Sequence, residues 1–414
     1  MVPQDLSPEP PIAMKQPSLA QQFIEARRAE IVVFIVLPVS LLIAAKRKLE
    51  DFLFFPSPSK HDDRVHQVIK AVEERNRHKD QKPLRTDRST YRSHSVRNDT
   101  KPNASQIPLR ELRCILSLVV DQKSGIIHVE PGATVGEVTS YLLKRGWILE
   151  CCLEMEDATL GGLAMAQGMT THSHVCGLLS ETVTEYRVVT ANGDCITVTD
   201  TNEHKDLFAA LPMSHGTLGF LVSLKLRVVP SQPWVKLIYT PLLASADLHQ
   251  QYTSVLRQAS RNDPNTPFFV ESIAFSKDTS VLMKGYLSPT NVNEEDNKTT
   301  PTTNRIGWWY KPWFFRHVQS KLKNKIVTTE YIPIREYLMR HDRSMCMTMA
   351  SIIPYGNHPF FRFLCGWMLP PQLTFLKSSH TKETREASLR KQCYQDVVSF
   401  HFRFVQAKYI QLGR

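Results

Sequence analysis

Glycine is scarce in this 414-residue chain, and its distribution is uneven. Only 16 glycines occur, and the first is Gly125, so the N-terminal part lacks the residue that most readily forms tight turns. None of the eight cysteines forms a CxxC pair, which argues against a zinc or thiol redox motif, and we expect no metal site. Their dispersed positions predict reduced, mostly buried thiols in the cytosol.

Extreme composition is absent as well. The chain is 42% hydrophobic and 22% charged, which excludes global disorder and a polytopic membrane protein, and its length predicts two or three domains. The net charge of +11 is densest between Arg64 and Arg113, without zinc spacing or regular aromatic interleaving. We therefore predict a solvated or membrane-facing basic surface and no nucleic-acid partner. No feature identifies a protein partner or an oligomeric state.

One long apolar segment is present, from Ile31 to Ala45, after an N-terminal tail (residues 1–30) that we expect to be disordered. Its 15 uncharged residues would span about 22 Å as a helix, less than the roughly 30 Å of a bilayer core. Pro38 argues against a regular buried helix, and no small-residue cleavage pattern follows. The segment predicts a transmembrane anchor in contact with lipid. The Lys46-Arg47-Lys48 cluster after it favours, weakly, a cytosolic body.

The rest of the chain predicts an α+β protein. A charged helix is expected over residues 61–78, and a hairpin turns between Asp121 and Gly125. Asn192-Gly193 is the strongest hairpin signal, and the alternating strand after it stops at Pro230. Beyond Pro230 a second region contains strands, a helix around Leu248 to Gln258, and many aromatic residues. No internal repeat is evident.

Two glycine-containing stretches carry the candidate cofactor site. Their small side chains allow backbone N–H groups to approach a phosphate or a planar ring closely, although a tight turn with close packing is an alternative. Neither is a P-loop or a Rossmann GxGxxG turn. The first stretch comprises Thr159, Leu160, Gly161, Gly162, Leu163, Ala164, Met165, Ala166, Gln167, Gly168, Met169, Thr170 and Thr171, and the second contains His215, Gly216 and Gly219.

The order of these segments resembles the FAD-binding domain of the vanillyl-alcohol oxidase and p-cresol methylhydroxylase superfamily. Further segments, such as EYIPIREY (330–337), RHDRS (340–344) and IIPYGNHPFFRFLCGWMLPP (352–371), resemble the Δ24-sterol reductases of the seladin and Diminuto/Dwarf type. The resemblance covers residues 31–398 with interruptions. It implies a p-cresol methylhydroxylase-type FAD-binding domain of two subdomains over residues 58–230, followed by a partial α+β sterol domain over residues 231–414.

The same resemblance implies non-covalent FAD, NADPH as electron donor, and reduction of the C24=C25 double bond of sterol side chains at the endoplasmic reticulum membrane, with a single-pass anchor. The proton donor is left unassigned among residues of suitable type: Tyr310, Tyr331, Tyr337, Glu330, Asp342 and His341. His94, His172 and His174 are expected to be surface or hydrogen-bonded residues and not flavin linkages. Eight aromatic residues could line a sterol slot or belong to the core: Trp308, Trp309, Tyr310, Trp313, Phe360, Phe361, Phe363 and Trp367.

Two departures from the family pattern favour an alternative. Residues 80–113 contain no glycine where the superfamily has a glycine-bearing turn near the pyrophosphate, and Arg88, Arg92 and Arg97 would compensate only electrostatically. The resemblance also ends at Val398, which predicts a C-terminally truncated substrate domain. The alternative is therefore an inactive, membrane-anchored flavin- or sterol-binding protein of the same fold.

Overall fold

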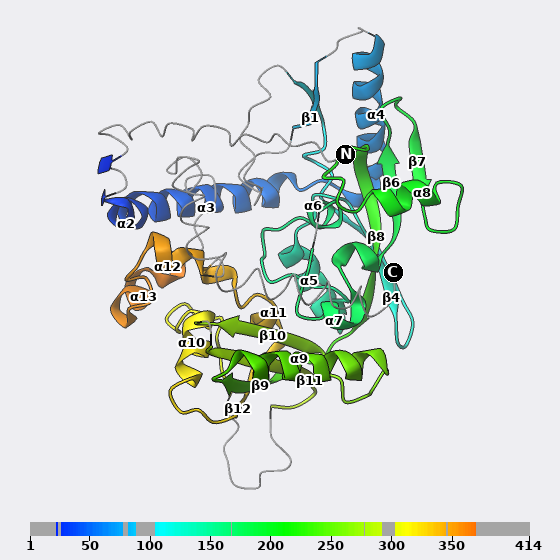
Figure 1. Cartoon of the computed structure of the whole chain (residues 1–414). Coiled ribbons are helices and arrows are strands. Elements are labelled where there is room, and N and C mark those ends of the chain that lie inside the picture. The colour runs from blue at the N-terminus through cyan, green and yellow to red at the C-terminus, as the bar shows by residue number, and fades with distance from the viewer. Residues whose placement is uncertain are drawn as a thin grey trace, which may run out of the picture.

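Two larger β-sheets and a two-stranded sheet organise the protein (Figure 1). The computed structural model describes residues 22–23, 26–77, 82–87, 104–166, 168–276, 278–291, 303–344 and 347–369. Several sequence predictions fall outside these residues: Gln167 of the first glycine stretch, His94, the three arginines of the glycine-free segment, and the chain from Pro370 onward.

The six-stranded sheet has the order β3-β4-β8-β6-β7, with β5 also paired to β8, and every pairing is antiparallel. The strands are β3 (Ile115–Val120), β4 (Gly125–Val129), β5 (Trp147–Leu149), β6 (Val183–Val189), β7 (Cys195–Val198) and β8 (Phe220–Pro230). Both predicted hairpins, β3-β4 and β6-β7, are confirmed, and Gly193 has the positive φ of 97° that its turn requires.

The four-stranded sheet has the antiparallel order β10-β11-β9-β12. Its strands are β9 (Trp234–Leu242), β10 (Phe269–Ala274), β11 (Ser280–Ser288) and β12 (Thr328–Pro333). Alternate side chains face opposite layers: Val270 and Leu282 pack on helix α9 (Ser245–Ser260), whereas Phe269 and Val281 enter the main core. The sheet is therefore covered on both faces.

Short helices connect the strands of the two larger sheets and follow the last of them. Helix α5 (Val135–Leu143) begins at a capping box in which Thr134 and Glu137 satisfy each other's backbone N–H groups, and Gly146 follows it with φ 79°. The remaining helices of this middle and C-terminal part are α6 (Leu160–Ala164), α7 (Ser173–Cys176), η4 (Leu179–Thr182), α8 (Lys205–Ala210), α10 (Phe314–Lys321), α11 (Ile334–Leu338), η5 (Asp342–Ser344), α12 (Thr348–Ile352), α13 (Pro359–Cys365) and η6 (Gly366–Met368).

Helix α4 (His61–Arg77), which follows the short η2 (Pro58–Lys60), covers the outer face of the six-stranded sheet. Val65, Val68 and Val72 are buried there, as the helical spacing predicts, near the parallel pair β1 (Leu84–Thr86) and β2 (Ser105–Ile107). Buried Glu130 fixes the base of α4, because it accepts hydrogen bonds from Arg64 at 2.6 Å and pairs with His61 at 2.7 Å.

The N-terminal apolar helix is longer than the sequence predicted. Instead of Ile31 to Ala45, it runs without interruption from Arg28 to Phe54, as α2 (Arg28–Ile31), a π-helical turn η1 (Val32–Val36) and α3 (Leu37–Phe54). The π turn explains how Pro38 is tolerated: Leu37 N–H bonds to the carbonyl of Val32, and the ring sits where regular α-helical bonding restarts. The helix is long and apolar enough to cross a membrane.

Candidate functional site

The first glycine stretch follows β5 and contains helix α6. Its N-terminal half is tied to the loop before α5, since Leu160 N–H bonds to the Ala133 carbonyl and Gly161 N–H to the Pro131 carbonyl, both at 2.9 Å. Gly161 is buried, and a Cβ there would lie 2.3 Å from the Cβ of Pro131. Packing against this loop therefore requires glycine at 161. Gly162, in contrast, is exposed between buried Gly161 and half-buried Leu163.

The second glycine stretch lies directly against the first. His215 N–H bonds to the Met165 carbonyl at 2.8 Å, which joins the two predicted stretches. The loop is unusual because Met213 and His215 adopt positive φ (66° and 51°) beside Gly216 at 76°. Non-glycine residues in this conformation carry strain, and such strain clusters at functional sites. Because the two stretches are in contact, they can contribute to one site. Cofactor binding by these residues stays a prediction.

The C-terminal end of the first stretch is fixed to the four-stranded sheet. Val270 N–H, on β10, bonds to the Thr171 carbonyl at 2.7 Å. His172 bonds through Nδ1 to the Phe268 carbonyl at 2.5 Å and stacks on that ring, and His174 bonds to the Pro267 carbonyl at 2.8 Å. Both histidines are buried and hydrogen-bonded, so they hold the end of the first glycine stretch against the start of β10. We call this contact between residues 170–174 and 267–271 the junction.

A buried ion cluster lies beside this junction. Arg340 donates from Nε and one terminal nitrogen to Glu271 of β10 at 2.9 and 2.8 Å, and His341 Nε2 pairs with the same carboxylate at 2.6 Å. Burial alone would raise the pKa of Glu271, but Arg340 and His341 more than offset it and hold that pKa far below its ordinary value. Arg340 also lies 3.4 Å from Glu154, just before the first glycine stretch, so the cluster bridges both regions.

Tyr337 is the residue of this region with an unsatisfied hydroxyl. Its side chain is buried near Thr171, and its oxygen has no hydrogen-bond partner of good geometry among the described residues. The Arg340 guanidinium lies 4.3 Å from the centre of its ring. Burial raises the pKa of Tyr337, so the hydroxyl keeps its proton in the resting protein. An unpaired buried O–H at this junction is suited to donate to a bound molecule.

Among the other candidate acids, Glu330, Tyr331 and Tyr310 are less suited to proton donation. Glu330 is held by His317, Lys321 and Tyr239; despite burial, His317 and Lys321 lower its pKa to about 2, so it carries no proton to give. Tyr331 lies buried on β12, and Tyr310 makes edge-to-face contacts with Trp308 and Trp309. Among the described residues, Tyr337 and His341 alone of the six candidates lie in the junction with a buried side-chain polar atom that lacks a hydrogen-bond partner.

Asp342 gives a pH-dependent stability prediction. Burial, with the charge of Glu156, raises its pKa from the ordinary 3.8 to about 7. The folded state therefore holds this proton more tightly than the unfolded chain, and the free energy of unfolding falls as pH rises from about 4 to 7. We expect Asp342→Asn to match the wild type at pH 4 and to exceed it by about 2–4 kcal/mol at pH 8, measured by urea denaturation.

Asp121→Asn is the control, because the stability that Asp121 contributes should depend on pH in the opposite direction. The amides of Lys123 and Ser124 lower the pKa of exposed Asp121, so its contribution is present at neutral pH and disappears in acid. Asp121→Asn should therefore be less stable than the wild type at pH 8 and should approach it in acid. An Asp342→Asn curve parallel to the wild type across this range would contradict the assignment.

The aromatic residues proposed for a sterol slot divide into two groups. Trp313 and Phe361 are buried in the core. The exposed group comprises Trp308, Trp309, Phe360, Phe363 and Trp367, and Tyr310 is half-buried and belongs to neither group. These side chains therefore do not line a common interior slot in the part of the chain that the structure describes.

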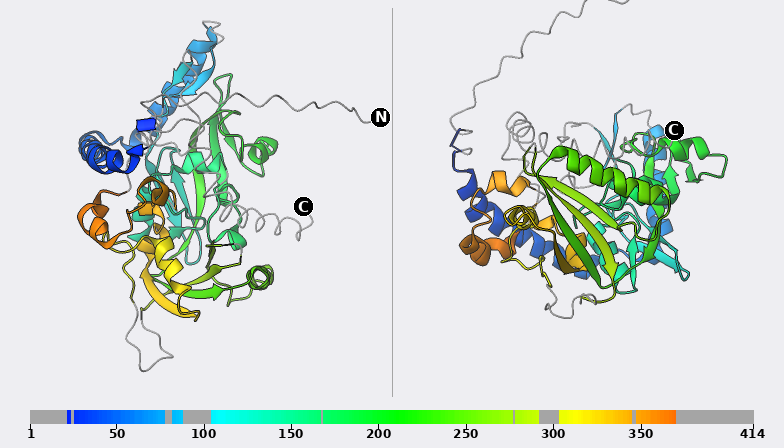
Figure 2. Two further views of the ribbon diagram at one scale, coloured as in Figure 1. Left: turned by 60° about the vertical axis from the view of Figure 1, so that its left-hand side comes forward. Right: turned by 60° about the horizontal axis from the view of Figure 1, so that its bottom comes forward.

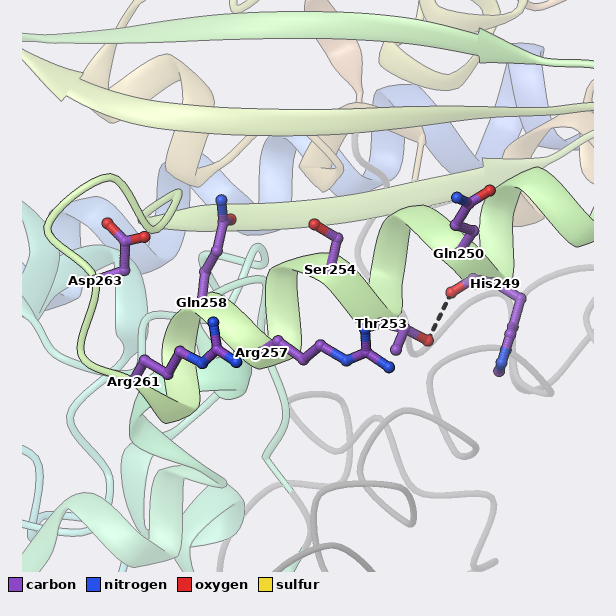
Figure 3. A pocket seen from close by; sticks show the side chains of 8 residues that line it. All are labelled: His249, Gln250, Thr253, Ser254, Arg257, Gln258, Arg261 and Asp263. Carbon is purple, nitrogen blue, oxygen red and sulfur yellow. Dashed lines mark hydrogen bonds between the residues drawn. The ribbon is translucent and has the colours of Figure 1, made fainter.

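A polar hollow on α9 is a separate feature (Figure 3). It lies on the solvent side of this helix and contains none of the predicted cofactor residues. Its lining is His249, Gln250, Thr253, Ser254, Arg257, Gln258, Arg261 and Asp263.

The junction fits a flavin in two respects. The exposed backbone at Gly162 leaves room for a planar or phosphate group among small residues, and the orphaned Tyr337 hydroxyl and His341 Nδ1 offer polar groups for a bound molecule. Sequence reasoning missed Glu154 and Glu271 altogether. Arg340 was noted only as part of a family-like segment, and no spacing pattern connects it with β10.

Comparison with known proteins shows sequence similarity to flavoproteins and sterol reductases. Residues 64–199 match the family described as FAD binding domain. The chain is 34% identical over 366 residues to the Delta(24)-sterol reductase of Homo sapiens, covering 88% of this chain and 68% of that protein. It is 32% identical over 402 residues to the Delta(24)-sterol reductase of Pisum sativum, covering 94% and 70%. A more distant match is the Xylooligosaccharide oxidase of Thermothelomyces thermophilus, 28% identical over 123 residues, 30% of this chain and 24% of that protein.

Proposed function

Because the chain belongs to the Delta(24)-sterol reductase family, we propose that it is an FAD-dependent reductase of the C24=C25 double bond of sterol side chains, with NADPH as electron donor. The single observation that supports this most is the junction where the first glycine stretch meets β10, next to a buried tyrosine whose hydroxyl has no hydrogen-bond partner of good geometry among the described residues. Family membership is the only support for NADPH.

The first glycine stretch and the loop at His215 to Gly219 would hold FAD. We propose that the cofactor lies between two subdomains of the region 58–230 and that its reactive ring faces the junction with the region from residue 231 onward. Thr170 and Thr171 end the stretch at this junction, so the residues beside them are placed to meet a substrate. Gly161 supports this cradle from behind by packing on Pro131.

Reduction of an isolated alkene requires hydride on one carbon and a proton on the other. FAD, when bound, supplies the hydride after reduction by the electron donor. We propose that Tyr337 supplies the proton. Arg340, above its ring, stabilises the phenolate that forms as the proton leaves, and Glu271 with His341 fixes Arg340 in that position.

The test is turnover by the purified chain. Detergent-solubilised protein supplied with FAD, NADPH and a Δ24 sterol should yield the sterol with a saturated side chain, identified by mass spectrometry. Omission of NADPH should abolish the product. If the protein binds flavin but produces no saturated sterol under any of these conditions, the proposed reaction is wrong.

We propose that the protein is attached to the endoplasmic reticulum membrane through Ile31 to Ala45, with the body in the cytosol. The helix can either cross the bilayer once, as the sequence predicts, or lie in the plane of the bilayer surface. The body contains three acceptor triplets, at Asn98, Asn103 and Asn297. We expect no change in electrophoretic mobility after endoglycosidase treatment of protein expressed in eukaryotic cells. A mobility shift that Asn103→Gln removes would place the body in the lumen.

A further inference from the structure

The N-terminal helix is fixed to the protein body along its length. Val32, Val33, Val36 and Leu37 are buried in the main core cluster, and α3 contacts η6. Near its start, Glu30 lies within electrostatic reach of Tyr355, between α12 and α13. Near its end, Asp51 forms an ion pair with Arg113, which also lies over the Phe55 ring.

A helix that crosses a bilayer has its two ends on opposite sides, and lipid surrounds the part that no other protein segment covers. Here both ends contact the same body. The second half also carries Lys46, Lys48, Glu50 and Asp51, which do not suit the hydrocarbon core. The other face of the helix exposes apolar side chains, with Phe34 at 75% and Leu42 at 71% exposure. This pattern suits a helix lying in the interface plane.

The segment α13–η6 also exposes large apolar side chains on one face. Phe360, Phe363, Leu364 and Trp367 follow helical spacing and are all exposed, whereas Phe361 on the other face is buried. Figures 1 and 2 show α12 and α13 beside the N-terminal helix, on one side of the molecule. An exposed apolar surface of this extent marks an interaction site.

Charge indicates what covers this surface. Lys46 and Lys48 are exposed and follow directly after the apolar part of the N-terminal helix. Exposed lysines beside apolar and aromatic side chains match the headgroup and upper acyl region of an anionic bilayer. The helix is also long and apolar enough for contact with hydrocarbon, which favours lipid over a protein partner.

We propose that the exposed faces of the N-terminal helix and of α13–η6 form one surface, the α3–α13 surface, that enters a single leaflet of a phospholipid bilayer with both helices lying in its plane. The body then rests on the membrane through two segments far apart in sequence. The start of the helix, at Arg28, then lies on the same side of the membrane as the body.

Tryptophan quenching tests the contact directly. The full chain is reconstituted into vesicles of phosphatidylcholine and phosphatidylserine, with and without bromine near the headgroup end of the acyl chains. Bromolipid should quench part of the emission, and Trp367→Phe should remove a distinct share of that quenching. Trp147→Phe, on β5, should leave the quenched share unchanged. Phe363→Trp in the Trp367→Phe background should restore quenching, because residue 363 lies on the same stripe.

Equal quenching of the wild type and Trp367→Phe would overturn the proposal, since it would mean that another part of the chain or a second copy covers the surface. The plane of the helix is tested separately with a glycosylation acceptor added before residue 1. We expect the tag to remain unmodified, like the body. Modification of the tag alone would show a single crossing and would also overturn the in-plane arrangement.

Discussion

Replacement of Tyr337 by phenylalanine is expected to lower NADPH-dependent turnover about 100-fold, the usual contribution of a positioned general acid. The change removes one oxygen and leaves the ring, which packs under Arg340 and against Phe269. The hydroxyl forms no well-aligned hydrogen bond with a described residue, so the fold should lose little stability. Flavin occupancy, measured by absorbance, should be unchanged, and so should the apparent affinity for the sterol.

Tyr186→Phe is the matched control. Tyr186 is also fully buried, its hydroxyl also lacks a partner among the described residues, and burial likewise raises its pKa. It lies on β6 and contacts Phe208, away from the junction. The control should retain wild-type turnover. If Tyr337→Phe also does so, the proton comes from another group, and His341 becomes the next residue to replace.

Replacement of Gly162 by valine is expected to reduce bound flavin at least about tenfold without unfolding the protein. Gly162 is exposed beside buried Gly161 and half-buried Leu163, so a β-branched side chain there projects into the space assigned to the cofactor. The ratio of flavin to protein absorbance measures the loss. Circular dichroism of the same sample shows whether the fold is retained. Wild-type flavin occupancy in this variant would mean that the cradle is placed incorrectly.

Gly161, which precedes Gly162, is expected to respond to substitution through stability and not through flavin binding. Gly161→Ala forces a Cβ against Pro131, with its Cβ at 2.3 Å and its carbonyl oxygen at 2.9 Å. We expect this smaller substitution to destabilise the fold, since the neighbour includes backbone that cannot move away. Two adjacent glycines should therefore respond differently, one through the cofactor and the other through packing. Sequence alone gave both the same role.

Local patterns predicted the elements well because they depend on local chemistry. The turn between Asp121 and Gly125, the Asn192-Gly193 turn and the alternation up to Pro230 each specify a short element without reference to distant residues. The extent of the N-terminal helix was misjudged because charge was taken as its boundary. Lys46 and Lys48 continue the helix, since their charges reach solvent on a surface helix.

The site was predicted less completely because its parts come from separate regions. The two glycine stretches were identified by small residues alone, and their contact through Met165 and His215 follows from the fold. Pairing of Glu271 with Arg340 joins residues 69 positions apart, on β10 and after α11, and no local pattern indicates such a contact. The unpaired state of the Tyr337 hydroxyl is likewise a property of packing.

The most direct test of the account follows the flavin spectrum of the purified, FAD-loaded chain without oxygen. Addition of NADPH should bleach the flavin absorbance, and subsequent addition of a Δ24 sterol should restore it, whereas a sterol with a saturated side chain should not. Denaturation should then release the flavin, because binding is non-covalent. A chain that takes up no FAD, or whose bleached flavin is unaffected by the Δ24 sterol, would contradict the central claim.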